Sequence, residues 1–395
     1  MGSPLSAFSQ FVLDTPAIYL TDAKSVIVEA QKRTYFLSRL LQGDHLERIQ
    51  GGQKIKDVII FDDASTMTDY QPNDTFTYQM PQVQTQHAAP WRFTMDHASW
   101  TDHEEALNEG ITMEAKKAEY KKLKETIYAR AVTSMMNGFE NRLWASPHGQ
   151  KAEMESDSGR TPYSIPALLN EETNGLPYGW TTVEQVNPAT ESNWKPTKVL
   201  YDYNDPVDLD GSQNGLLDAF EDMLLRLTWN PPKWEEGKRY FEKPGDERTR
   251  VIACSRYGMT LFKYVCRERN DRLISVNNPA IPGINFNGID LEYVNALDSA
   301  ALYATGSAGT YNTETASATT TQGPRYYWLD ARYLKFFVHG GHFMDRKVLP
   351  KNMSQPFTNV MIWDTWWNLF CRSRKRLGII SPGASGSSSA SGTFA

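Results

Sequence analysis

The longest regular pattern in the sequence is an apolar stripe that predicts one long helix, from about Thr101 to about Trp144. Apolar residues recur there every four positions, at Leu123, Ile127, Ala131, Met135, Phe139 and Leu143. Residues Thr101 to Glu104 have the form of a capping box, which marks a helix start. Unbroken, such a helix spans roughly 60 Å. The narrow stripe predicts packing against a single layer, and the lack of a strict heptad argues against a coiled coil.

Composition limits the class of protein. The chain has 395 residues, of which 40% are hydrophobic and 22% charged, as in globular proteins with one or more sizeable cores. The formal net charge of -6 gives no global basic field for tight nucleic-acid binding. No apolar run approaches the length of about 18 residues that suggests a membrane span, so no membrane partner is expected. The three cysteines lack metal-ligand spacing and no secretion signal is seen, which predicts synthesis in a reducing cytoplasm.

Residues 49–100 predict a long two-stranded hairpin. Gly51 and Gly52 open it, Val58 to Phe61 is a short strand, and alternation at Thr75–Tyr78 and at Trp91–Met95 predicts the two long strands. Residues 80–90 between them are read as a polar tip. An isolated two-stranded ribbon is marginal in water, so this hairpin needs another surface. That surface belongs either to another copy of the chain or to the sheet of the same molecule, in which case the hairpin is an ordinary edge.

Other segments show shorter patterns. Helices are predicted over 22–41, 165–169, 212–228 and 256–268, the last capped by Ser255. Strands are predicted over 250–254 and 284–294. The aromatic-rich segments 326–337 and 357–380 are extended and return to the layer of the long helix. Residues 304–324 predict a flexible exposed loop, and residues 382–395 a disordered tail.

Chemical motifs are sparse, and no catalytic, cofactor-binding or metal site is predicted. No phosphate loop, dinucleotide-binding glycine motif or zinc protease helix occurs. Asp208 and Asp210 read as turn and cap residues, and His339 to His342 as a turn between strands. Arg372, Arg374 and Arg376 fall on one face of the last predicted strand. They either touch phosphates, or form a solvated face that pairs with acidic residues of a neighbour.

The order of these parts resembles a known family. The local sequence carries the likeness at Ile49-Gln-Gly-Gly52, in the Trp91 strand that leads into the long helix, from Gly179 to Trp194, and in Cys371-Arg-Ser-Arg-Lys-Arg-Leu-Gly-Ile379. From about residue 10 to 381 the chain resembles the major capsid protein of tailed double-stranded DNA bacteriophages. That family has the Hong Kong 97-type fold, an α+β architecture with an N-terminal arm, an extended hairpin loop, a long spine helix, and peripheral and axial domains.

The resemblance implies a division of the chain. The expected parts are an N-terminal arm (1–48), the extended hairpin loop (49–100), the peripheral domain with the spine helix (101–235), the axial domain (236–324), return strands of the peripheral domain (325–381) and the tail (382–395). The extended loop would lie over a neighbouring subunit, and axial domains would meet around the five-fold and six-fold centres.

The resemblance also implies a function. The chain would self-assemble as hexamers and pentamers into the icosahedral head of a virion, after synthesis in the bacterial host cytoplasm. Expected partners are further copies, a separate scaffolding protein, a portal, a decoration protein and loosely held double-stranded DNA. Expected inter-subunit contacts are Lys54, Lys56, Trp91, Arg92, Arg372, Arg374 and Arg376. Two alternatives remain: an encapsulin-like nanocompartment shell, and a carbohydrate-active enzyme that binds through aromatic side chains.

Overall fold

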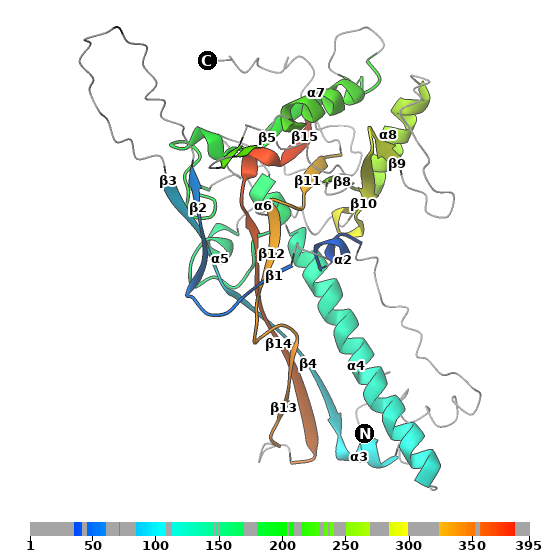
Figure 1. The fold of residues 1–395 in the computed structure, drawn as a ribbon. Helices are drawn as coiled ribbons and strands as arrows, with labels where there is room; N and C mark the ends of the chain where they lie inside the picture. The colour runs from blue at the N-terminus through cyan, green and yellow to red at the C-terminus, as the bar shows by residue number, and fades with distance from the viewer. Residues whose placement is uncertain are drawn as a thin grey trace.

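The described part of the chain forms two β-sheets, a projecting helix and a separate hairpin (Figure 1). The computed structural model describes residues 35–41, 46–60, 71, 84–107, 113–145, 147, 150–169, 180–203, 205–208, 215–228, 233–235, 238–240, 250–268, 284–298, 324–351 and 356–383. The predicted strand at Thr75–Tyr78 and nearly all of the predicted 304–324 loop lie outside these ranges. So do residues 1–34 of the predicted arm and residues 384–395 of the predicted tail.

The long sheet is organised around one strand, β14 (Thr358–Cys371). One edge of β14 pairs antiparallel with β4. The other edge pairs antiparallel with β13 near the start of β14 and with β12 near its end, and β1 lies parallel to β12. The bounds of these neighbours are β1 (Leu46–Ile49), β4 (Arg92–Thr101), β12 (Leu334–His339) and β13 (Asp345–Leu349). The predicted turn at His339 to His342 is confirmed, since it joins β12 to β13.

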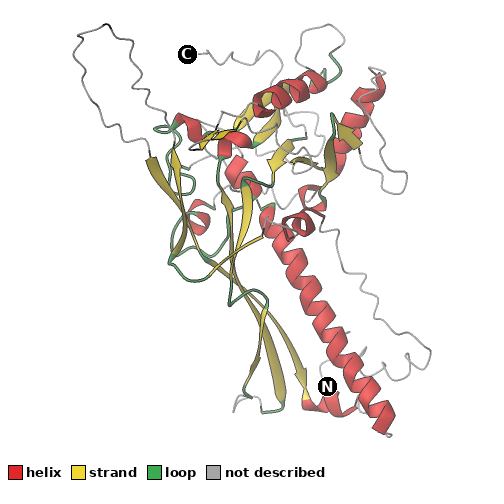
Figure 2. Ribbon diagram, in the orientation of Figure 1, coloured by secondary structure: helices red, strands yellow, loops and turns green. Residues whose placement is uncertain are grey.

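The spine helix covers one face of this sheet. The structure gives two helices, α3 (Asp102–Leu107) and α4 (Met113–Leu143), with residues 108–112 outside the description. The predicted stripe is confirmed from Ile127 onward, because the residues at every fourth position to Leu143 are all buried. At 31 residues, α4 is about 46 Å long. Together with α3 and the lower parts of β4, β13 and β14 it forms a projection, called the leg below (Figure 2).

The predicted capping box is confirmed at the base of the leg. The Thr101 amide donates to Glu104 Oε2 at 2.8 Å, and the Glu104 amide donates to Thr101 Oγ1 at 3.2 Å. Thr101 is also the last residue of β4, so the box turns the chain directly from strand into helix.

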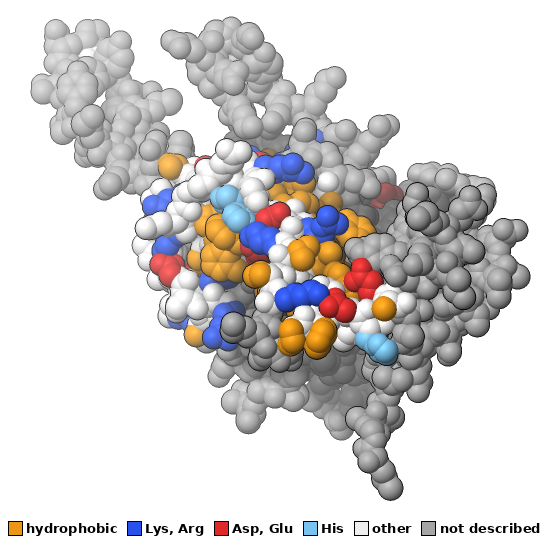
Figure 3. Space-filling model, turned by 90° about the horizontal axis from the view of Figure 1, so that it is seen from below, with side chains coloured by type: hydrophobic (Ala, Val, Ile, Leu, Met, Phe, Trp, Pro, Cys, Tyr) orange, Lys and Arg blue, Asp and Glu red, His pale blue; other side chains and the backbone are white. Residues whose placement is uncertain are grey.

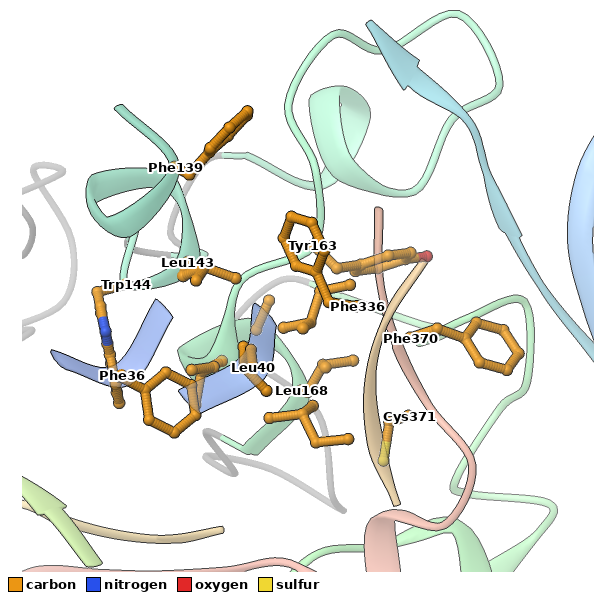
Figure 4. Close-up of a cluster of buried hydrophobic side chains, with 14 of the residues drawn as sticks. Phe36, Leu40, Phe139, Leu143, Trp144, Tyr163, Leu168, Phe336, Phe370 and Cys371 are labelled. Carbon is orange, nitrogen blue, oxygen red and sulfur yellow. The ribbon is translucent and has the colours of Figure 1, made fainter. Parts of the chain in front are cut away.

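The main core lies where α4 meets the long sheet. Phe139 packs on Trp367 and Phe336 with ring centroids 5.2 and 6.3 Å apart, and Phe336 stacks on Trp367 at 4.8 Å. Helix α2 (Tyr35–Leu41) and helix α6 (Ile165–Leu169), the latter as predicted, close the same cluster (Figure 4). Each aromatic pair adds about 0.5–1.5 kcal/mol beyond its buried area, so the aromatic residues hold the spine helix on the sheet.

The upper sheet has the strand order β5-β15-β11-β8-β10-β9 and packs against α7 and α8. Its elements are β5 (Thr197–Asp202), α7 (Leu216–Thr228), β8 (Arg250–Cys254), α8 (Arg256–Glu268), β9 (Ile284–Phe286), β10 (Ile289–Tyr293), β11 (Tyr326–Asp330) and β15 (Gly378–Gly383). The predicted Ser255 cap is present, since the Gly258 amide donates to Ser255 Oγ at 3.1 Å.

The upper sheet combines strands from inside and outside the range 236–324 that was predicted for the axial domain. β8, β9 and β10 fall inside the range, whereas β5, β11, β15 and α7 come from segments assigned to the peripheral domain. The reason is that β8 is buried along its whole length, so it needs a partner on each edge, and the partner β11 lies beyond residue 324. Residues 382 and 383, assigned to the tail, belong to β15.

The hairpin also differs from the prediction. β2 (Lys54–Ile60) pairs antiparallel with β3 (Gln84–Pro90), in the segment read as a polar tip. The Trp91–Met95 strand belongs instead to the long sheet, as β4. β3 lacks the alternation of a half-buried strand because its inner residues make polar contacts, described below. Smaller elements are α5 (Lys151–Met154), η2 (Ser192–Trp194), β6 (Lys233–Glu235), β7 (Lys238–Tyr240), η4 (Asn295–Asp298) and η6 (Arg374–Arg376).

Candidate assembly surface

One face of the leg exposes apolar side chains to solvent. Phe93 and Met95 on β4 are 62% and 61% exposed, although both are large and apolar. Asp364 lies opposite Met95, but Trp366 lies opposite Phe93, and the apolar residues farther along the same side of β14 and β13 are mostly half-buried. We call this set the outer sheet face: Phe93, Met95, Leu349, Val360, Ile362 and Trp366.

The register explains how the sequence builds this face. Alternate residues of a strand point to opposite sides, so Phe93 and Met95 share a side, and Thr94 and Trp100 point the other way. The second side is the one under α4: Trp100 clusters with Ile127, and Trp363 lies beside Tyr128 at 6.2 Å. A helix therefore covers one side of the leg, whereas the outer sheet face keeps its apolar side chains accessible.

Charged and imidazole groups lie on the same side as these apolar residues: Asp364 and Lys347 within the strands, and His342 at the β12–β13 turn. The His342 ring stacks on Trp366 with centroids 4.0 Å apart, and its Nδ1 lies 3.6 Å from Asp364 Oδ2. The Trp366 indole donates to the same carboxylate at 3.1 Å, and Lys347 Nζ lies 3.6 Å from it. Seen from the lower end of the molecule, apolar side chains alternate with basic, acidic and histidine side chains (Figure 3). Such a mixture of accessible apolar and charged side chains is compatible with a protein–protein interface, which as a whole is only about as apolar as other protein surface.

The base of the hairpin is held by a buried polar pair. His87 Nδ1 on β3 lies 3.0 Å from Glu184 Oε2, and both side chains are fully buried. Glu184 Oε1 accepts from the Cys371 amide at 2.8 Å, and the Glu184 carbonyl accepts from the Ala88 amide at 3.0 Å. Burial raises the pKa of Glu184, and the hydrogen bond from His87 opposes that rise. One carboxylate thus joins the hairpin to the end of β14.

The turn that carries Glu184 has an unusual backbone. Glu184 and Gln185 have φ values of 53° and 67°, and Val183 and Val186 exchange both of their backbone hydrogen bonds across them. Such a primed turn normally holds Asn or Gly, and each strained non-glycine residue costs about 1–3 kcal/mol. The strain places the carboxylate inside the protein, where it meets His87 and the Cys371 amide.

Arg92 is the second anchor of the hairpin base. Its guanidinium is buried and donates to four main-chain carbonyls, those of Met154, Ser156, Gly159 and Thr161, at 2.5–2.9 Å. Burial lowers the pKa of Arg92, and nearby acidic and tyrosine side chains oppose that effect. The loop held in this way carries Asp157, which pairs with Lys54 of β2 at 2.7 Å.

The seven predicted contact residues therefore do not form one surface, because some of them lie in the interior. Arg92 and Arg374 are interior residues: Arg374 sits in η6, not on a strand face, and donates to the Leu168 and Trp194 carbonyls at 2.7 and 3.1 Å. This corrects the prediction of one arginine face, which fails because the strand ends at Cys371 and the chain turns through η6.

The remaining five differ in exposure: Trp91 is buried, and the other four reach the surface at least in part. Trp91 is buried and donates from its indole to the Gly52 carbonyl at 3.0 Å. Arg372 pairs with Glu47 and Asp57, Arg376 lies over the Tyr333 ring, and Lys56 is exposed. Sequence reasoning missed the outer sheet face, although the alternation at Trp91–Met95 was visible. It also missed His87 and Glu184, which no local pattern marks.

Within the described residues, no group of three or more His, Cys, Asp or Glu side chains is arranged to hold a metal ion. None of the described helices combines the length and the hydropathy that crossing a membrane requires.

Comparison with known proteins identifies the fold. No protein-family profile and no curated protein matches the sequence. Among solved structures, the cyanophage A-1(L) capsid asymmetric unit aligns with a TM-score of 0.56 at 10% identity, covering 92% of this chain and 97% of that one. The capsid of an empty GTA particle gives 0.54 at 11% identity over 94% and 98%, and that of a native GTA particle 0.51 at 11% over 93% and 96%. The chain therefore has the α+β Hong Kong 97-type fold of these capsid proteins.

Proposed function

We propose that this chain is a major capsid protein, which self-assembles into the icosahedral head that encloses a phage double-stranded DNA genome. The observation that carries the proposal is the likeness to capsid subunits along more than nine-tenths of both chains. The leg and the hairpin, which project from the rest of the described chain, are unusual in a solitary globular protein.

The outer sheet face supports assembly. Large apolar side chains that stay accessible on a rigid sheet mark a protein–protein contact. Burying each such side chain against a partner stabilises the complex by about 1.5–3 kcal/mol. Shells are closed by many copies of a few such contacts, related by symmetry. Of the predicted inter-subunit contacts, we retain the two exposed residues Lys56 and Arg372. They are proposed in addition to the outer sheet face.

The proposal assigns roles to the parts of the fold. The leg and the long sheet form the peripheral domain, and the upper sheet with α7 and α8 forms the axial domain around the symmetry centres. The β2–β3 hairpin is the extended loop that lies over a neighbouring subunit. The role is structural and needs no catalytic residue. A separate scaffolding protein, a portal and a decoration protein complete the particle, and the acidic chain holds the packaged DNA only loosely.

The test is the particle itself. The full chain is produced in bacteria, purified, and examined by sedimentation velocity and electron microscopy, alone and with the scaffolding protein of the same genome. Closed icosahedral particles are expected, with nuclease-protected DNA in particles taken from infected cells. A stable monomer under all these conditions would contradict the proposal. Particles that hold an enzyme instead of DNA would indicate a nanocompartment shell.

A further inference from the structure

A buried carboxylate joins the start of the described chain to the spine helix. Glu140, near the end of α4, is 5% exposed. Its Oε2 accepts a hydrogen bond from the Leu37 amide of α2 at 3.0 Å, and its Oε1 accepts one from the Trp144 indole at 3.1 Å. The first of these bonds connects residues that are 103 positions apart in the sequence.

Helix α2 depends on this contact. It has seven residues, and so short a helix is not stable by itself in water. Phe36, Leu37 and Leu40 are buried, with Phe36 packed against Trp144 at 5.3 Å. The Leu37 amide is one of the first-turn donors that no helix can satisfy internally, and Glu140 supplies its acceptor.

Among the residues that the structure describes, the two groups that donate to the carboxylate carry no charge. From α2 it meets a backbone amide, and from α4 it meets an indole, both neutral. Tyr327 of β11, which packs on Trp144 at 5.5 Å, is the titratable side chain on the sheet side, and the charged neighbour on α4, Arg142, is exposed. An ionised carboxylate buried beside neutral groups is costly, whereas the protonated form is tolerated.

We propose that Glu140 is a proton-controlled latch, which docks α2 on the spine helix more tightly when its carboxyl group is protonated than when it is ionised. The sign follows from linkage. Burial raises the pKa of Glu140 to about 7, against the opposing effect of its two hydrogen bonds. A carboxyl group whose pKa is higher in the docked state favours docking at low pH. That advantage is lost as pH rises through 7.

Hydrogen exchange of the full chain tests the latch. Protection factors of the α2 amides, corrected for intrinsic exchange, are measured at pH 6 and pH 8, with α6 as internal reference. The docked carboxyl group changes its proton occupancy over this range and the released one does not, so α2 protection is expected to be about tenfold higher at pH 6. Protection of α6 is expected to keep the same value at both pH values.

Two variants identify the group. Glu140→Gln should remove the difference between pH 6 and pH 8. Glu221→Gln, which changes an exposed carboxylate on α7, should keep it. Equal α2 protection at both pH values in the unaltered chain would overturn the proposal, and this measurement decides even if Glu140→Gln does not fold. A tenfold difference that persists in folded Glu140→Gln would also overturn it. The inference does not depend on shell formation, since it is read on the subunit.

Discussion

At the scale of single residues, the buried guanidinium of Arg92 makes an unusual set of hydrogen bonds. A guanidinium normally pairs with a carboxylate, yet this one donates to four backbone carbonyls of one short loop. No other type of side chain could donate to all four carbonyls, because only arginine presents several donors in a fixed plane. The loop shape, and with it the position of Asp157 beside Lys54, depends on that side chain.

Arg92→Met should therefore destabilise the subunit, although methionine fills much of the same volume. One buried and three partly buried carbonyls lose their donors together, which should lower the free energy of unfolding by about 2–4 kcal/mol. Urea unfolding followed by circular dichroism measures the change. Arg160→Met, on the same loop but exposed, is the control and should stay within about 0.5 kcal/mol of the original chain. Equal losses of stability in the two variants would show that the hydrogen bonds from Arg92 to the four carbonyls do not stabilise the subunit.

Gly159 in the same loop leaves no room for a side chain. A Cβ atom there would lie 2.1 Å from the Glu153 carbonyl oxygen, which is backbone and cannot rotate away. Gly159→Ala should therefore lower stability by about 1–3 kcal/mol in the same urea experiment. Gly341→Ala is a fair comparison, because its Cβ would come no closer than 3.8 Å to the His339 ring. A neutral Gly159→Ala would contradict the close packing of this loop.

At the scale of elements, local pattern predicted helices better than strand partners. α6, α7, β8 and α8 were predicted because each carries its own apolar periodicity and, for α8, a capping residue. β3 was not, because Gln84–Pro90 owes its place to β2 and to Glu184, far away in sequence. The outer sheet face was missed for a similar reason: alternation shows that β4 has two sides, but α4 decides which one is covered.

The outer sheet face yields a prediction about assembly. Met95→Asp places a second carboxylate opposite Asp364, and this repulsion costs only about 1 kcal/mol, so the subunit should stay folded. The added charge within the proposed contact should raise the critical concentration for particle formation at least about tenfold. Light scattering against concentration gives that value, and far-UV circular dichroism reports folding. Leu225→Asp, at an even more exposed apolar position on α7 (72%), should assemble normally. Normal assembly of Met95→Asp would remove this face from the proposed contacts.

At the scale of the whole molecule, the described part of the hairpin is anchored at its base, through His87 and through Arg92. Replacing residues 61–83 by Asn-Gly would join the last ladder pair, Ile60 and Gln84, through a two-residue turn of the favoured type. The anchors at His87 and Arg92 stay intact. We expect a folded subunit that fails to close shells, seen as open or absent particles by electron microscopy. Closed particles of normal size would contradict the assigned role of this loop.

The crossing from β14 to β15 has a mechanical consequence. Residues 372–377 carry the chain from the long sheet straight into the upper sheet, and Arg374 fixes that short passage to two interior carbonyls. Because this connection is short and fixed, a force on the leg is transmitted directly to the upper sheet. If a shell of such subunits changes size or curvature, the strain must be absorbed by bending of α4 and β14 or by slippage between neighbours, since this junction cannot act as a hinge.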